Sequence, residues 1–351
     1  MSETKTRIKD IAALASVSVG TVDRVLHNRG EVAQKTREKV LKIVKETEYS
    51  PNVMAQALKL KKKFSFASLL PESNENNPFW IKHPAGMQKA IRELEPFPIS
   101  LHHITFDIFS EADFQAKTKK ILSDKPDGVL LAPIFKAESI LFCRKLKEAN
   151  IPFVFVDGFI DETDFLSYTG ENIFQSGRVA GQLTDIVTPE KGDILLVNIA
   201  RNLQNIHHLN SRTQGFLNYF ETSGRNSGKK IMLNISDPSL SSVFKSLEKT
   251  FSKHNNICSV FMTGSKSHLI ASYLHEKKIR NVNVVGYDLL DMNVAFLKSG
   301  IIKFLIGQKP EEQTFRGIKK LFEYLSLNKT PGKIEYLPVD IVTSENVDFF
   351  L

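Results

Sequence analysis

Cysteine is scarce in this chain of 351 residues, which holds only two, far apart and in no paired spacing. A disulfide framework or a zinc site built from cysteine pairs needs more thiols, so we interpret Cys143 and Cys258 as ordinary buried thiols. No apolar run is long enough to span a membrane, and the polar N-terminus lacks the apolar segment of a signal peptide. These absences predict a cytoplasmic protein that does not associate with a membrane.

Enzyme motifs are also missing. The sequence contains no GxGxxG, no GxxxxGK, no HExxH and no GxSxG pattern. Its histidine doublets, at 102–103 and 207–208, lie on short elements, and adjacent residues of a strand point to opposite faces, which disfavours chelation. We therefore predict a protein that is not an enzyme and that has no catalytic residues, no metal and no cofactor.

Positive charge is unevenly distributed along the chain. Residues 1–63 contain 14 Lys and Arg side chains against 7 Asp and Glu, whereas the remaining residues contain 33 against 32. The formal net charge of +8 therefore comes almost wholly from the first 63 residues. A small basic module on a near-neutral body predicts that only the module contacts a polyanion, because a generically basic protein would spread its charge.

Three short helices are predicted between residues 7 and 48. The first has an apolar stripe at i, i+3, i+4 and i+7, formed by Ile8, Ile11, Ala12 and Ala15. The second is capped by Ser18, ends before Gly30, and rests on Val22, Val25 and Leu26. The third spans 36–48 and places Val40, Leu41 and Val44 inside.

From Phe64 onward, apolar β-rich runs alternate with amphipathic helical segments. The predicted strands are 64–71, 99–106, 128–133, 152–157, 193–199, 230–236, 259–264 and 283–288. The predicted helices between them include 84–95, 111–123, 137–149, 175–187 and 211–223. Apolar strands that alternate with helices indicate parallel sheets covered on both faces, and this number of units favours two doubly wound subdomains over one sheet.

Residues 8–59 resemble the DNA-binding headpiece of the lac repressor family of bacterial regulators. The similarity runs unbroken through DIA of the first helix, the turn ASVS, the recognition helix TVDRVL, the third helix TREKV and the hinge YSPNVMAQAL. The resemblance implies an all-α helix-turn-helix headpiece over residues 1–50 and a hinge helix with a basic linker over 51–63. It also implies a homodimer, associated with the nucleoid, that binds near-palindromic operator DNA through the major groove.

The second helix is the predicted reading element, and its outer face carries Val19, Gly20, Asp23, Arg24 and His27. Arg24 matches the family's base-reading arginine, since a guanidinium suits bidentate contact with guanine, although a phosphate contact or ion pair is the alternative. Val19 and Gly20 match variable specificity positions but have no side-chain donor. Asp23 departs from the family's serine, and either accepts from a cytosine amino group or pairs with a nearby basic residue.

Phosphate contacts are predicted for a set of small polar residues, namely Ser18, Thr21, Asn28 and Thr36. Ala33 replaces the serine that usually caps the third helix, so about 1 kcal/mol of capping is expected to be missing. The hinge places Asn52, Ala55 and Gln56 at the DNA, and Leu58 matches the leucine that wedges into the minor groove. The alternative for Leu58 is packing on the body. A helix this short is marginal alone and is expected to form only with DNA and a partner.

The body, residues 64–351, resembles the sugar-binding core of the same family, whose type I fold is shared with periplasmic binding proteins. The resemblance implies an N-subdomain of about 64–167 with 308–329 and a C-subdomain of about 168–307 with 330–351. The chain crosses between them three times. A small effector, expected to be a sugar or sugar derivative, binds in the cleft at the carboxyl ends of the strands.

Several cleft residues follow from this resemblance. Phe79 and Trp80 follow the first strand, and the Trp80 indole suits a sugar face unless it is a core aromatic. Arg212, in the pattern NSRTQGF, would hold hydroxyls or a carboxylate, with a structural ion pair as the alternative. Asp288 would accept from two hydroxyls, Gln308 lies at a crossover, and Asp157 is as well explained by hinge structure. Gly264 and Ser265 replace the family's usual Asn-Asp pair, which favours a different effector.

The sequence thus predicts an effector-controlled transcription regulator, expected to be a repressor, whose operator affinity falls or rises when the cleft is filled. One rival is a transport-type sugar-binding protein, which shares the body but lacks the basic headpiece. Another is a doubly wound enzyme such as a sugar kinase or dehydrogenase, which the missing phosphate-binding loops argue against.

Overall fold

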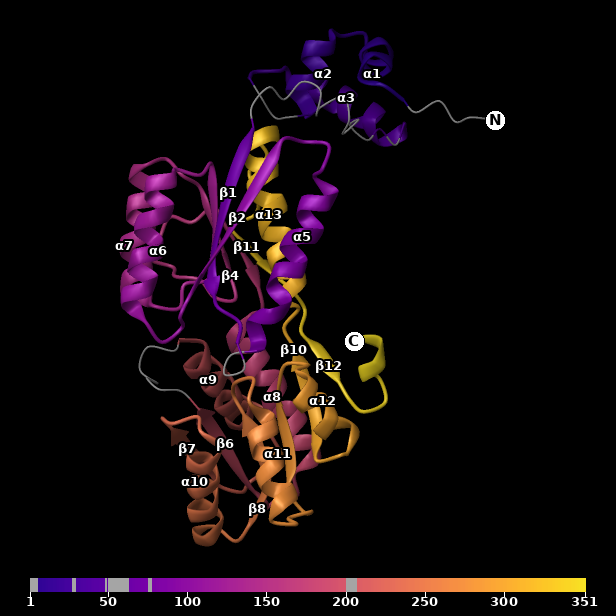
Figure 1. Ribbon diagram of the computed structural model, residues 1–351. Helices are drawn as coiled ribbons and strands as arrows, with labels where there is room; N and C mark the ends of the chain where they lie inside the picture. Colours follow the sequence, from indigo (N-terminus) through magenta and orange to yellow (C-terminus); the bar gives the residue numbers. More distant parts are fainter. Residues whose placement is uncertain (1–5, 27–29, 48, 50–62, 75–77, 200–206) are drawn as a thin grey trace.

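The computed structural model describes residues 6–26, 30–47, 49, 63–74, 78–199 and 207–351, which Figure 1 draws in colour. Six residues with predicted DNA contacts lie outside the described residues, namely His27, Asn28, Asn52, Ala55, Gln56 and Leu58. Their predicted roles therefore stay predictions.

The headpiece consists of three helices, α1 (Ile8–Ala15), α2 (Val19–Leu26) and α3 (Gln34–Glu46). They enclose a small apolar core formed by Ile11, Ala12, Ala15, Val22, Val25 and Val40. The turn between α1 and α2 passes through Ser16 in the left-handed region, with φ of 57°. The Ser18 hydroxyl caps α2 by accepting a hydrogen bond from the Thr21 amide at 3.1 Å, as predicted.

Two details of α3 differ from the sequence prediction. The helix begins at Gln34, two residues before the predicted start. Leu41, predicted to lie inside, is 47% exposed. The stripe of α3 that faces the core runs through Val40 and, one turn later, Val44, and Leu41 is rotated by about 100° around the helix from Val40. As predicted, Ala33 at the N-cap of α3 makes no side-chain capping hydrogen bond.

The N-subdomain is a parallel sheet with helices on both faces (Figure 1). Its strand order is β11-β5-β4-β3-β1-β2, with the bounds β1 Phe64–Pro71, β2 Ile99–Phe106, β3 Gly128–Leu131, β4 Phe153–Val156, β5 Ser167–Gly170 and β11 Ile334–Tyr336. Helices α6 (Glu111–Asp124) and α7 (Lys136–Glu148) cover one face, and α5 (His83–Glu93) and α13 (Pro310–Leu327) cover the other. A short 3-10 helix, Pro78–Lys82, leads into α5.

The C-subdomain repeats this arrangement. Its strand order is β12-β10-β9-β8-β6-β7, with the bounds β6 Asp193–Ile199, β7 Lys230–Ile235, β8 Ile257–Met262, β9 Asn283–Tyr287, β10 Ile302–Gly307 and β12 Asp340–Val342. Among the strands that the structure describes in this sheet, only β12 runs antiparallel to its neighbour. One face is covered by α8 (Ile173–Val187) and α9 (His207–Thr222), and the other by α10 (Leu240–Lys253), α11 (Ser267–Glu276) and α12 (Asp291–Lys298). A 3-10 turn, Val347–Phe349, follows β12.

Among the described residues, all eight predicted strands are present, together with four that were not predicted, β5, β10, β11 and β12. Two of these correct the predicted subdomain boundaries. β5 extends the N-subdomain sheet to Gly170, and β11 joins the same sheet by pairing Ile334 with Tyr168. Residues 168–170 and 334–336, which the prediction assigned to the C-subdomain, therefore belong to the N-subdomain sheet, because main-chain pairing holds them there.

Close helix packing fixes the position of α9 in the C-subdomain. A β-carbon on Gly177 of α8 would lie 2.2 Å from the carbonyl oxygen of Arg212, and one on Gly215 of α9 would lie 2.0 Å from that of Phe174. Both positions therefore require glycine for the two helix backbones to approach this closely. The consequence is that the backbone of Arg212 is held against α8, with its side chain directed into the molecule.

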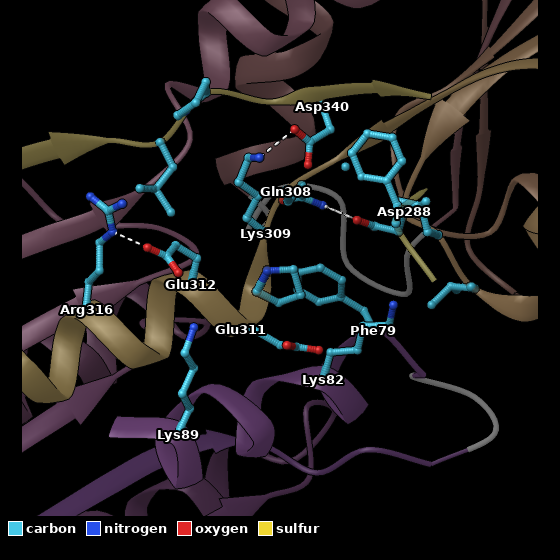
Figure 2. Close-up of a pocket in the computed structure, with 17 residues that line it drawn as sticks. Phe79, Lys82, Lys89, Asp288, Gln308, Lys309, Glu311, Glu312, Arg316 and Asp340 are labelled. Carbon is cyan, nitrogen blue, oxygen red and sulfur yellow. Dashed lines mark hydrogen bonds and ion pairs between the residues drawn. The ribbon is translucent and has the colours of Figure 1, made fainter. Parts of the chain in front are cut away.

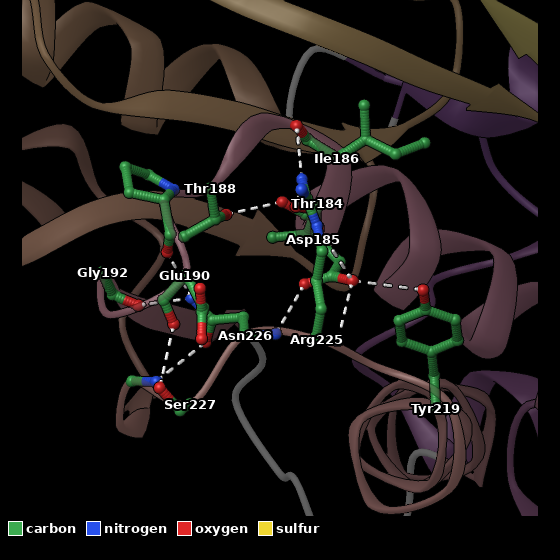
Figure 3. A network of polar contacts seen from close by, with 12 residues as sticks. Thr184, Asp185, Ile186, Thr188, Glu190, Gly192, Tyr219, Arg225, Asn226 and Ser227 are labelled. Carbon is green, nitrogen blue, oxygen red and sulfur yellow. Dashed lines mark hydrogen bonds and ion pairs between the residues drawn. The ribbon is translucent and has the colours of Figure 1, made fainter.

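The far end of α8 is fixed by a polar network (Figure 3). The buried Asp185 carboxylate accepts hydrogen bonds from the backbone amides of Arg225 at 3.1 Å and Asn226 at 3.0 Å, and from the Tyr219 hydroxyl at 3.3 Å. These contacts fasten the α9–β7 turn to α8. Since they lie at the opposite end of the helix from Arg212, we interpret this network as structural.

Candidate functional site

The outer face of α2 has the exposure that a DNA-reading helix needs. Val19 is 45% exposed, and Gly20 and Arg24 are exposed beside it. The Arg24 Nε donates to the Gly20 carbonyl at 3.2 Å, which holds the guanidinium stem along the helix. Asp23 is half-buried. The pKa of Tyr49 is raised, first by the burial of the Tyr49 side chain and then by the negative charge of Asp23. The base contacts predicted for these residues stay predictions.

A concavity beside α2 gathers three of the predicted phosphate donors. Its volume is about 380 Å³, and its walls include Ser18, Thr21 and Thr36 together with Arg24. The Ser18 and Thr21 hydroxyls are 2.9 Å apart at the first turn of α2, where the positive end of the helix dipole also favours an anion. Hydroxyl donors, a helix N-terminus and an arginine form the usual setting for a DNA phosphate.

The second candidate site lies between the subdomains, where one aspartate ends an equivalent strand in each. Asp157 follows β4 and Asp288 follows β9, the fourth strand of each sheet when counted from its β2 or β7 edge. Both residues have left-handed backbones, with φ of 66° and 70°. Aspartate and asparagine tolerate this conformation better than most residues, so the chain can turn sharply and place a carboxylate at each strand end.

A buried arginine joins the two subdomains. Arg212, from the first turns of α9, is 3% exposed and pairs with Glu171, which is 2% exposed and follows β5 at the first crossover. Its guanidinium also donates to the Gln308 side chain at 2.6 Å and to the Thr263 carbonyl at 2.9 Å. The Tyr287 ring lies 3.8 Å from the guanidinium carbon. Arg212 thus makes the ion pair that was the alternative to a ligand contact, and its predicted ligand contact stays a prediction.

Asp288 is held from two sides. The Gln308 amide donates to its two carboxylate oxygens at 2.9 and 3.1 Å, and the Ser265 hydroxyl donates at 2.6 Å. The Asn293 amide holds the surrounding backbone by donating to the carbonyls of Ser265 and Asp288. Ser265, one of the two departures from the family pattern, thus has a defined place beside Asp288.

The charges in this cluster shift one another's protonation. Burial raises the pKa of Asp157 to about 7 and that of Asp288 to about 6, although Arg212 acts in the opposite direction on both. Glu171 adds to the upward shift of both aspartates. Burial lowers the pKa of Arg212, but its acidic neighbours outweigh that effect and the net shift is upward. The cluster therefore contains more carboxylates than its arginine neutralises.

Gln313 connects the cluster to the N-subdomain. Its side-chain oxygen accepts from the Asp157 amide at 2.7 Å, and its side-chain nitrogen donates to the Gln308 carbonyl at 2.9 Å. Gln313 lies in the first turn of α13 and is fully buried. One side chain thus links the end of β4 to the second crossover segment, so the strand end and the crossover are positioned together.

A cavity of about 470 Å³ adjoins the cluster and receives residues from both subdomains (Figure 2). Phe79, Asp288 and Gln308, all predicted cleft residues, lie in its wall. The charges of its lining balance. The basic residues are Lys82, Lys89, Lys309 and Arg316, and the acidic residues are Asp288, Glu311, Glu312 and Asp340. Lys309 pairs with Asp340 at 2.5 Å across this space.

Trp80 is not where the prediction placed it. It is 4% exposed and belongs to the N-subdomain core, with its ring stacked on His83 at 4.3 Å. The 3-10 helix turns Trp80 inward and leaves Phe79 at the cavity wall. Burial lowers the pKa of His83 to about 3, so this histidine is neutral under the indole. The core-aromatic alternative is thus correct for Trp80, and we assign the aromatic wall to Phe79.

Sequence reasoning missed Glu171 and Gln313. Glu171 follows a strand of only four residues, but Asn172 after it caps α8 by accepting from the Gln175 amide at 3.0 Å. An Asn cap before an apolar helix was a readable signal for a strand-to-helix junction there. Gln313 carries no comparable signal, because its role depends on contacts across more than 150 positions of sequence.

Among the described residues, no group of three His, Cys, Asp or Glu side chains is arranged to hold a metal ion. In the same part of the chain, no helix has the length and apolar character needed to cross a membrane.

Two protein families match separate parts of the chain. Residues 7–52 match the family described as bacterial regulatory proteins, lacI family, and residues 67–330 match the periplasmic binding protein domain. Among curated relatives, the ribose operon repressor of Lactococcus lactis is 26% identical over 294 residues, which cover 82% of each chain. The transcriptional regulator DegA of Bacillus subtilis is 31% identical over 153 residues, 43% of this chain and 44% of that protein.

Solved structures are similar over 82% of the chain. A putative LacI transcriptional regulator from Bacteroides fragilis superposes with a TM-score of 0.77 at 29% identity, covering 82% of this chain and 99% of that one. The glucose-galactose binding protein GanP from Geobacillus stearothermophilus superposes with a TM-score of 0.72 at 19% identity, covering 82% and 99%. The second similarity concerns the fold alone.

Proposed function

We propose that a sugar held between the two subdomains controls the operator affinity of this chain. The premise is that the chain belongs to the lacI family of bacterial regulatory proteins and is a DNA-binding transcription regulator. Relatives named as repressors of the ribose and sucrose operons support both the repressor role and the class of effector. A regulator of this kind acts in the cytoplasm, at the nucleoid, and catalyses no reaction.

The observation that carries the proposal is the polar cluster between the subdomains. Asp157 belongs to the N-subdomain, Asp288 and Arg212 to the C-subdomain, and Glu171 and Gln308 to the crossovers. A polyol that bonds to both aspartates would fix the angle between the two sheets. Since each headpiece precedes β1 in the chain, a change in that angle alters the spacing of the two headpieces on DNA.

We propose that the active form is a homodimer. Two headpieces then meet a near-palindromic operator, and the two-fold axis sets the separation of the half-sites. A transport-type binding protein, the rival reading, shares the core fold, but it has no use for the helix-turn-helix headpiece that precedes this core.

The test measures DNA binding by fluorescence anisotropy, using a palindromic operator and a scrambled duplex at several salt concentrations. We expect specific binding that weakens steeply with salt and that a bound sugar changes by about 5–150-fold, the usual range of such coupling. A sugar that binds the protein but leaves the operator affinity unchanged would contradict the proposed control.

A further inference from the structure

The cluster between the subdomains has more hydrogen-bond acceptors than donors. Among the described residues, none donates to the side-chain carboxylate of Asp157, whose backbone amide donates to Gln313. The second carboxylate oxygen of Glu171, Oε2, is buried without a hydrogen-bond partner. Glu171 Oε2 is a buried acceptor, which is costly unless a donor reaches it, whereas the Asp157 carboxylate is half-buried. Both carboxylates can therefore accept hydrogen bonds from a ligand that brings donors to this point.

Arg212 has little donor capacity left. Four of its five N–H groups already donate to Glu171, Gln308 and the Thr263 carbonyl. In the part of the chain that the structure describes, Arg212 is also the only cation that is fully buried. Burial lowers the pKa of the buried His83 to about 3, so this histidine adds no positive charge. A ligand's carboxylate or phosphate could take a two-point contact from Arg212 only by displacing one of these partners.

The charge balance leads to the same result. Asp157, Glu171 and Asp288 bring three carboxylates into mutual electrostatic contact, and only Arg212 offsets them. A ligand with a negative charge would add a fourth anion to a site whose Glu171, Asp288 and Arg212 side chains are buried, and like charges repel more strongly there than in water. A ligand with a positive charge would relieve the excess.

We propose that the effector is a sugar or polyol that carries a protonated amine, and that the carboxylates of Asp157 and Glu171 hold the ammonium group. This inference rests on the proposed function of the cleft. An ammonium group has three N–H donors, which match the Asp157 oxygens and the free Glu171 oxygen. The hydroxyls of the same molecule bond to Asp288, which Gln308 and Ser265 hold in place.

A neutral sugar satisfies this site less well. Its hydroxyls donate hydrogen bonds to the same oxygens but leave the excess charge of the carboxylates in place. Hydrogen bonds between an ionised donor and an ionised acceptor are also stronger than those of a neutral hydroxyl. The cleft therefore ranks three classes of ligand, with the amine first, the neutral parent second and the anion last.

Matched ligands test this order. Isothermal titration calorimetry at pH 7.0 compares, for each of several pentoses and hexoses, the neutral sugar, its amino-deoxy derivative and its uronic acid or phosphate. We expect at least one amine to bind at least tenfold more tightly than its neutral parent and the anions to show no binding. Overturning results are a neutral sugar that equals or exceeds its amine, or an anion that binds.

Two variants locate the ammonium group. Asp157→Asn keeps the shape and the left-handed backbone of the strand end, and we expect it to reduce the preference for the amine by about tenfold. Asp164→Asn is the matched control, since Asp164 is an exposed aspartate of the same subdomain that is paired with Lys147 and lies outside the cavity wall, and the preference should be unchanged. Thermal unfolding and operator binding verify that both variants are folded.

The outcomes separate this inference from the function beneath it. If neutral sugars bind and change the operator affinity without any preference for amines, the proposed control by a sugar is supported and the proposal of an amine effector is refuted. If no member of any matched set binds, both proposals fail together. An unchanged amine preference in Asp157→Asn would place the ammonium elsewhere and refute the assignment to this carboxylate.

Discussion

Replacing Asp157 by asparagine is expected to stabilise the ligand-free protein, and to do so increasingly as the pH rises. The folded-state pKa is about 7 because burial and the carboxylates of Glu171 and Asp288 disfavour the charged form. An unfolded aspartate ionises near pH 3.9. The folded chain thus binds the Asp157 proton more tightly than the unfolded chain between about pH 4 and pH 7. The free energy of unfolding therefore falls as the pH rises through this window.

The magnitude follows from the size of the shift. One pKa unit corresponds to about 1.36 kcal/mol. The raised pKa of Asp157 therefore lowers the free energy of unfolding by at most roughly 4 kcal/mol at pH 8. Asp157 is half-buried, and its repulsion is shared with two other carboxylates, so we expect about half of this maximum. Asp157→Asn should then stabilise by about 2 kcal/mol at pH 8 and by less than half as much at pH 5.

Thermal unfolding of the full chain at several pH values measures this. A gain of about 2 kcal/mol should raise the Tm by about 4 °C at pH 8, with a smaller rise at pH 5. Asp185→Asn is the control, because the Asp185 carboxylate accepts two backbone amides and cannot be replaced by an amide nitrogen (Figure 3). The control should lower the Tm at both pH values. If Asp157→Asn destabilises the chain at pH 8, or shifts the Tm equally at all pH values, the crowding of carboxylates is not the dominant force in the cleft.

The remaining predictions concern the headpiece and the helix packing. Ala33→Ser should supply the missing cap of α3 and stabilise an isolated headpiece by about 1 kcal/mol, measured by urea unfolding. Arg24→Ala should weaken specific operator binding by about 1–3 kcal/mol and nonspecific binding far less; equal losses in anisotropy would make Arg24 a phosphate contact only. Gly177→Ala should lower the Tm and weaken effector binding together, because the new methyl group meets the Arg212 backbone; a loss of stability with unchanged effector affinity would separate the α8–α9 contact from the cleft.

Local signals in the sequence predicted the elements that depend on local order. The headpiece helices follow from apolar stripes such as Ile11, Ala12 and Ala15, and the longer strands follow from continuous apolar runs. The short strands β5 and β11 carry no such signal, because three or four residues suffice once neighbouring strands hold them in register. The subdomain boundaries shifted for this reason.

The candidate site was predicted in part. Asp157, Arg212, Asp288 and Gln308 come together, since strand ends and helix starts meet at one edge of each sheet. The partner of Arg212 could not be deduced, because Glu171 belongs to a crossover whose course depends on both sheets. Trp80 was misplaced since residue type alone does not tell whether an indole faces a ligand or a core.

The strand order also fixes when each part of this protein can fold during its synthesis. The three headpiece helices are complete by residue 46, whereas the N-subdomain sheet waits for β11 at 334–336 and the C-subdomain sheet for β12 at 340–342. At a translation rate of about 5–20 residues per second, roughly 15–60 s separate the two events. The part that meets DNA is therefore ready long before the part that restrains it, and a nascent chain passes through an interval in which its headpiece is folded while neither half of its core is complete.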